Sequence, residues 1–165
     1  MKHSFFLLLL LVTAGSVSAQ LKVKPDCGVI TVDVFKGWVN EVKPNADPEQ
    51  MKAKLPCFTS FEKEDNTSTC GGGVFLDDKG IRFYTQRDYI VINNKFKGKF
   101  TAPVMGVKKA NMFTRFGNPK MKDGNWEAYQ MAYGIMIVYY NPAGVANKVI
   151  ISTKTTDDID LCTTN

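Results

Sequence analysis

The stretch MGVKKANMFTRFGNPKMKDGNWEAYQMAYGIMIVYYNPAGVANKVIIS, from Met105 to Ser152, decides the fold of this chain. Its apolar residues recur at helical spacing from Val107 to Phe116, and Gly117-Asn118-Pro119 then ends the helix. Three apolar segments separated by turn residues follow. We interpret them as strands spanning Trp126 to Met131, Gly134 to Tyr140 and Lys148 to Ser152. The stretch therefore predicts a short helix followed by antiparallel strands.

A less regular version of this order lies earlier in the chain. Asp47-Pro48-Glu49 is a helix start, because an Asp side chain caps first-turn amides and Pro fits the first helical position. Pro56 ends that helix, and residues 74–76, 81–85 and 89–92 have the pattern of strands. Two tandem units, residues 47–92 and 105–152, are one interpretation of this likeness, and chance is the other.

A further strand is predicted before the first unit. From Gly28 to Trp38 the chain is rich in β-branched residues, and Ile30, Val32 and Val34 alternate with more polar neighbours. We therefore predict one α+β domain over residues 20–165, with an antiparallel β-sheet, two short helices and two disulfides. A chain of this length buries one core but hardly two independent ones.

The N-terminus has the pattern of a secretory signal peptide. Lys2 precedes an apolar run, and small residues end the segment at Ala19, so we expect residues 1–19 to be removed. The apolar run is shorter than the roughly 20 residues that a membrane-spanning helix needs. We therefore predict an exported protein, periplasmic or extracellular, with no transmembrane segment in the mature chain.

All four cysteines lie in the predicted mature chain. An even number of cysteines in an exported protein indicates two disulfides, with three connectivities open. We favour Cys57–Cys70, which would close a local loop, together with Cys27–Cys162, which would tie the two chain ends. A zinc site is the alternative, but the spacing does not favour it, and we expect no metal and no cofactor.

The composition argues against catalysis. The single histidine, His3, lies in the predicted signal peptide, so the mature chain has no histidine for a catalytic triad or for a metal site. Two disulfides would leave no thiol nucleophile. Glu127, close to an aromatic cluster, is the one acid that we consider for a carboxylate-based glycan hydrolase, which would need a second carboxylate. We therefore expect a protein that is not an enzyme.

Two groups of residues are candidates for binding. Lys95, Lys97 and Lys99 alternate with Phe or Gly, which in an extended chain puts three ammonium groups on one side. This segment is either an edge strand whose lysines prevent pairing with another sheet or a surface that contacts an anionic partner. In the second case, further basic residues would belong to the surface: Lys108, Lys109, Arg115, Lys120 and Lys122. Trp126, Tyr129 and Tyr133 form the second group, as aromatic anchors for a partner. Without Lys2 the chain has 20 basic and 16 acidic residues, a net charge of +4, which is too small to indicate a nucleic-acid partner.

The order of a helix, the Gly117-Asn118-Pro119 stop, a Tyr133-Gly134 strand, a turn and a closing strand resembles β-lactamase-inhibitor-protein-like domains and the related small outer-membrane assembly lipoproteins. The resemblance implies a module that binds other proteins and catalyses no reaction. The chain departs from the lipoproteins because no lipidated cysteine follows the signal peptide. No site residue of these families can be assigned to a position here.

Three hypotheses for the function follow. The first is an exported, non-catalytic binding module that contacts a protein partner. The second is a binder of an anionic ligand, a lipid headgroup or a polysaccharide, through the lysine-rich segment. The third is a carboxylate-based glycan hydrolase that uses Glu127.

Overall fold

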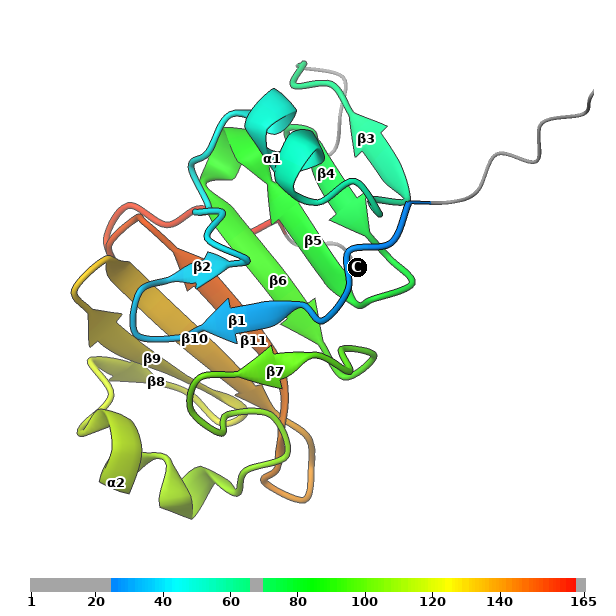
Figure 1. Cartoon of the computed structure of the whole chain (residues 1–165). Helices are drawn as coiled ribbons and strands as arrows, with labels where there is room; N and C mark the ends of the chain where they lie inside the picture. Colours follow the sequence, from blue (N-terminus) through cyan, green and yellow to red (C-terminus); the bar gives the residue numbers. More distant parts are fainter. Residues whose placement is uncertain (1–24, 66–69, 163–165) are drawn as a thin grey trace, which may run out of the picture.

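The computed structural model describes residues 25–65 and 70–162, which form one large and one small β-sheet and two short helices (Figure 1). The large sheet is antiparallel, and its strands lie in the order β3-β4-β5-β6-β11-β10-β9-β8. Their bounds are β3 (Ser60–Glu62), β4 (Gly73–Leu76), β5 (Ile81–Tyr84), β6 (Tyr89–Asn93), β8 (Met121–Lys122), β9 (Trp126–Met131), β10 (Gly134–Tyr140) and β11 (Ala146–Ser152). The remaining elements are β1 (Thr31–Asp33), β2 (Trp38–Val39) and β7 (Lys99–Phe100) of the small sheet, α1 (Pro48–Lys54) and α2 (Phe113–Phe116), and the 3-10 helices η1 (Thr85–Arg87) and η2 (Lys109–Asn111). The predicted α+β class is confirmed.

The large sheet consists of two meanders of four strands each. Strands β3 to β6 pair in sequence order, strands β8 to β11 do the same, and β6 pairs with β11 to join the two halves. A short helix precedes each meander, α1 before β3 and α2 before β8. This element order matches the two predicted units, and an internal duplication stays a prediction.

The second meander follows the sequence closely. Strands β9 and β10 have the predicted bounds, and β11 begins two residues before the predicted start at Lys148. Gly134, at the start of β10, has φ 144°, and a Cβ atom there would lie 2.4 Å from the carbonyl oxygen of Ser152. Only glycine allows the two backbones to approach this closely.

The predicted strand from Gly28 to Trp38 is wrong in its length. Asp33 turns the chain, because its carboxylate accepts hydrogen bonds from the backbone N–H groups of Phe35 and Lys36, both at 3.0 Å. Gly37 completes the turn with φ 71°, and β2 then runs back along β1. The predicted burial of Ile30, Val32 and Val34 is nevertheless confirmed: each is at most 3% exposed.

The predicted helix from Val107 to Phe116 is also too long. Backbone hydrogen bonds hold the start of this segment against the end of the second meander, from Ala146 N–H to the Val107 oxygen at 2.9 Å and from Lys109 N–H to the Gly144 oxygen at 2.8 Å. These bonds keep Val107 extended, so that only η2 and the single turn of α2 remain helical. The predicted end is confirmed, since Gly117 follows α2 with φ 74°.

Helix α1 forms for the predicted reason. The Asp47 carboxylate accepts hydrogen bonds from the backbone N–H groups of Glu49 and Gln50, at 2.8 and 3.4 Å. Met51 and Leu55 are fully buried, so the helix packs its apolar side against the sheet. Such a cap stabilises a helix by about 1 kcal/mol.

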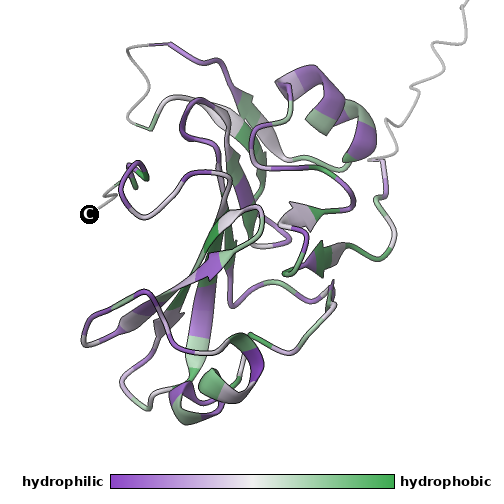
Figure 2. Ribbon diagram, turned by 90° about the vertical axis from the view of Figure 1, so that its left-hand side faces the viewer, coloured by the Kyte–Doolittle hydropathy of each residue, from purple (hydrophilic) through white to green (hydrophobic). Residues whose placement is uncertain are grey.

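The two faces of the large sheet have different covers (Figure 2). The small sheet and α1 lie on one side, and their apolar residues share one core with that face. We call it the covered face. On the other side, residues 153–162 cross the sheet and pack Ile159 and Leu161 against it. We call this segment the strap and the surface beneath it the strap face.

All four cysteines form disulfides, as predicted, but the favoured pairing is wrong. The bonds are Cys27–Cys57 and Cys70–Cys162. Although they are only 13 positions apart in the sequence, Cys57 belongs to the core of the covered face and Cys70 to the cluster of the strap face. The sheet separates them, so that they cannot form a bond. The first disulfide fixes the start of the described chain, and the second holds the strap.

One further prediction, the signal peptide over residues 1–19, lies outside the described residues.

The disulfide pairing leads to a direct prediction. Tryptic digestion without reduction should link the peptide that contains Cys27 to that of Cys57, and the peptide of Cys70 to that of Cys162. Because Lys63 lies between Cys57 and Cys70, mass spectrometry of the linked peptides distinguishes all pairings. A linked peptide that joins Cys57 to Cys70 would contradict the structure.

Candidate functional site

A disulfide, a hydrogen bond and an ion pair hold the strap against the strap face. Cys162 is bonded to Cys70, and its backbone N–H donates to the Tyr89 hydroxyl at 3.1 Å. The guanidinium of Arg87 forms an ion pair with Asp160. These contacts hold the strap over the middle of the sheet and leave a hollow on each side of it.

The first hollow lies over β5, β6, β11 and β10 and has a volume of about 560 Å³. Three cationic side chains line it, Arg82, Lys95 and Lys148. The one carboxylate in its lining is that of Asp77, which pairs with Arg82 at 2.5 Å. Lys95 and Lys148 have no carboxylate partner among the described residues, and the hollow therefore has a net positive charge.

Lys148 and Lys95 are positioned in different ways. On β11, Lys148 lies two positions from Ile150, which is on the same face of the sheet. Lys95 follows β6 in a turn in which its backbone N–H donates to the Asn93 side chain at 2.9 Å. The sheet thus fixes Lys148, while Lys95 lies at the exposed rim.

Aromatic rings form much of the floor of this charged hollow. The Lys148 ammonium nitrogen lies 3.8 Å from the ring centroid of Tyr139, and the Arg82 guanidinium carbon lies 5.4 Å from that of Phe75. The rings of Tyr84 and Tyr89 are 4.8 Å apart. Burial lowers the pKa of Lys148 and raises that of Tyr139. A half-buried ammonium group over an aromatic ring, without a carboxylate, is suited to an incoming anion.

The second hollow lies over β8, β9 and β10 and is smaller, about 200 Å³. Its lining is apolar except for Thr156, and Ile159 and Leu161 of the strap form one side. The floor contains Trp126, Ile137 and Tyr139. Tyr139 and Leu161 also line the charged hollow, so the two hollows meet at these residues.

Two of the six predicted binding residues lie on the strap face, Lys95 in the charged hollow and Trp126 in the apolar one. Lys97 lies in the loop before β7 and lines a further hollow together with Lys95 and Lys79. Lys99 belongs to β7, where it pairs with Thr31 on the other side of the molecule. The structure therefore brings Lys95 and Lys97 together at one hollow, which Lys99 does not line. The predicted strand is formed only at its end, since β7 contains two residues.

The two predicted tyrosines, Tyr129 and Tyr133, belong to the core of the covered face. The Tyr133 ring packs beneath Gly37, where a Cβ atom would lie 2.4 Å from it. Its hydroxyl is buried with no hydrogen-bond partner among the described residues, and burial raises its pKa. Neither residue lines the strap-face hollows.

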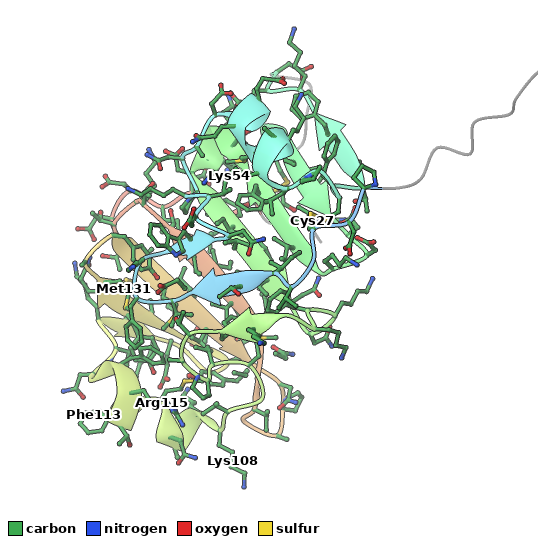
Figure 3. The ribbon with its side chains drawn as sticks, in the orientation of Figure 1. Cys27, Lys54, Lys108, Phe113, Arg115 and Met131 are labelled. Carbon is green, nitrogen blue, oxygen red and sulfur yellow. A yellow bond between two sulfur atoms is a disulfide. The ribbon has the colours of Figure 1, made fainter. Side chains whose placement is uncertain are left out.

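The basic residues that precede β9 lie elsewhere. Lys108 and Arg115 are exposed near the end of the molecule that contains α2, together with Phe113, which is 60% exposed (Figure 3). Lys120 and Lys122 are exposed on either side of Met121. None of these cations lines either strap-face hollow.

Sequence analysis missed Arg82 and Lys148. A usable signal was present for Lys148, because it is the one charged residue of a strand predicted to be apolar. The aromatic residue beside each cation comes from a neighbouring strand, and only the strand register identifies it: Lys148 pairs with Tyr139, and Arg82 pairs with Phe75.

Glu127 is not part of the strap face. It lies on the covered face and is 8% exposed. The hydroxyls of Tyr129 and Tyr140 both donate to its Oε2 atom at 2.6 Å, and the Lys109 ammonium nitrogen lies 3.8 Å from its Oε1 atom. Burial raises the pKa of both phenols, and the hydrogen bonds to Glu127 raise it further. The carboxylate thus joins β9, β10 and η2.

No helix among the described residues is long and apolar enough to span a membrane, and no group of three or more potential metal-ligating side chains occurs among them.

Comparison with known proteins gives no match: no family model, no curated protein and no solved structure is similar to this chain. The function therefore has to be inferred from the residues of this chain alone.

The buried carboxylate gives a prediction for stability. Glu127→Ala would leave two buried hydroxyls without an acceptor, and we expect the free energy of unfolding to fall by about 1–3 kcal/mol for each of them. Urea unfolding followed by circular dichroism measures this. Glu41→Ala, which removes an exposed ion pair with Lys54, is the control and should cost less than about 1 kcal/mol. Equal effects of the two substitutions would contradict a structural role of Glu127.

The raised phenol pKa values predict a loss of stability in alkali. An unfolded phenol ionises near pH 10, whereas Tyr129 and Tyr140 keep their protons to higher pH in the folded protein. Their contribution to stability is therefore fully present below pH 10 and is lost as the pH rises from there through the folded values. Urea unfolding at pH 8, 10 and 11 should show the loss, and the Tyr129→Phe/Tyr140→Phe variant should show a shallower one. An unchanged slope in that variant would contradict the assignment.

Proposed function

We propose that the protein is an exported, non-catalytic binding module that takes an anionic ligand in the charged hollow of the strap face. The observation that carries this proposal is the position of Lys148. Its ammonium group is half-buried against the Tyr139 ring and has no carboxylate partner among the described residues. Removing a charge from water without a partner costs free energy, and a bound anion would supply that partner.

The surroundings of Lys148 support the same ligand class. Asp77 is neutralised by Arg82, so that Lys95 and Lys148 contribute an excess of two positive charges. Low-dielectric walls formed by Tyr84, Tyr89 and Tyr139 strengthen the attraction for an anion in the hollow. The aromatic rings also offer flat surfaces to a ligand that carries the charge on a ring or a chain.

Export and absence of catalysis are part of the proposal. Two disulfides fit a protein that folds in an oxidising compartment, and the periplasm and the extracellular space both qualify. The mature chain as predicted contains no histidine, and all four cysteines are in disulfides. Glu127 accepts hydrogen bonds from two tyrosines on the opposite face. A glycan hydrolase that uses Glu127 is therefore less well supported, and unchanged turnover of a glycan by Glu127→Gln would remove it.

A protein partner, the first hypothesis from the sequence, is less well supported than an anionic ligand. The large apolar side chains that are exposed come from five segments of the chain: Val29, Phe35, Phe61, Phe113 and Met121. The Phe35 ring packs against Phe116 of α2. Of the five, only Met121 lines a strap-face hollow. A protein interface usually has a contiguous apolar centre.

The test uses a sulfated dextran oligosaccharide as the anionic probe. Isothermal titration calorimetry should detect binding, and added salt should weaken it. We expect Lys148→Gln to weaken binding at least about tenfold, because the half-buried charge is lost.

Lys99→Gln is the matched control, since it removes the same charge from β7 on the other side of the molecule. It should change the affinity less than about twofold, the effect of one distant, screened charge. Equal losses in the two variants would show that only net charge matters and would contradict the proposed site. Failure of the probe to bind would contradict a sulfated polysaccharide as the ligand.

A further inference from the structure

The two hollows of the strap face together indicate a more specific ligand. We propose that the strap face binds a single-chain amphiphile with one anionic head group, of which a fatty acid is the simplest, with the head group in the charged hollow and the chain in the apolar hollow. This inference rests on the proposed function, because it assigns the same anion site at Lys148.

Register places the two halves of such a ligand side by side. Lys148 on β11 pairs with Tyr139 on β10, and Tyr139 pairs with Trp126 on β9. The three side chains therefore form a row across three adjacent strands, with about 4.8 Å between neighbouring strands. A molecule that lies across the strands would meet the ammonium group first, then the phenol ring and then the indole ring.

The hollows adjoin along this row. Tyr139 and Leu161 line both of them, so a ligand that occupies both hollows would pass these two side chains. Leu161 comes from the strap and Tyr139 from the sheet, and a chain that passes between the hollows would contact both residues. The charge is confined to one end, since the apolar hollow has a single polar residue in its lining, Thr156.

A purely polar anion would leave the apolar hollow unused. Trp126 and Ile137 form its floor, and Ile159 of the strap forms one side. Each methylene group that moves from water into such a site strengthens binding by about fourfold. The chain length of the ligand therefore decides how much of the available surface contributes to affinity.

The experiment follows the fluorescence of Trp126 during titration with octanoate, decanoate and dodecanoate below their micellar concentrations. The only other tryptophan, Trp38, lies in the small sheet, and a Trp38→Phe background assigns the signal to Trp126. We expect a change in emission with each ligand and an affinity that rises about tenfold or more for every two methylenes. Decan-1-ol, which has a matched chain without charge, should bind at least about tenfold more weakly than decanoate.

Two substitutions test the site. Lys148→Gln should reduce decanoate binding to the level of decan-1-ol, whereas Lys99→Gln should leave decanoate binding unchanged. Loss of decanoate binding in Lys99→Gln as well, or an affinity for fatty acids that does not depend on chain length, would overturn the inference. Binding only to vesicles that contain anionic lipid, and never to the monomeric acids, would also overturn it.

The result with sulfated dextran separates this inference from the proposed function. If the oligosaccharide binds and requires Lys148 but no fatty acid binds, the anion site stands and the amphiphile is wrong. If decanoate binds through Lys148 and the oligosaccharide does not, the amphiphile stands and the oligosaccharide is the wrong kind of anion. If neither ligand binds, both proposals are wrong.

Discussion

The structure depends on the pairing of β6 with β11. Each meander alone is a small sheet of four strands, and this one ladder of five residue pairs, from Tyr89 with Ser152 to Asn93 with Lys148, makes them a single sheet. It also fixes which side chains face which side. A slip of β11 by one residue would move Lys148 to the covered face, into the core with Ile90 and Ile92, and would turn Val149 away from that core. The apolar pattern of both strands therefore specifies the register.

A sheet that is apolar on both faces has to be shielded from water on both, and in this chain one face is covered by many more residues than the other. The small sheet, α1 and the segment before β8 cover one face, and the covered face contains the larger core. The strap alone crosses the other face and reaches it through Ile159 and Leu161. The Cys70–Cys162 disulfide compensates for this small contact area, since a disulfide typically stabilises the folded state by about 2–4 kcal/mol. The two hollows are the part of the strap face that the strap does not fill.

Much of the fold could be predicted from local signals. Strands β9 and β10 were found with their bounds, because apolar alternation and turn residues decide them within the segment itself. The errors occurred where distant parts of the chain act. The predicted helix at Val107 is shortened by hydrogen bonds to Ala146 and Gly144, and the disulfide pairing depends on which face of the sheet each cysteine occupies.

The candidate site was harder to predict than the fold for the same reason. Lys95 and Trp126 were found as residue types that bind ligands, but the site also needs Lys148, Tyr139 and Arg82, which come from other strands. Their grouping is a consequence of register across β5, β6, β11 and β10. The alternating lysines gave only part of the site, because the chain turns at Lys95 and Lys99 belongs to β7 of the small sheet.

Lys148 is the point at which the fold and the proposed ligand site meet. The three central strands, β6, β10 and β11, contain no other charged residue. A threonine or valine at position 148 would suit a strand better, since β-branched side chains fit the sheet and need no hydration. Half-burial lowers the pKa of the ammonium group, which means that the sheet disfavours its charge, and no carboxylate offsets this cost among the described residues. A residue type that does not suit its secondary structure occurs mainly at functional sites, and here a bound anion would provide the counter-charge that the fold lacks.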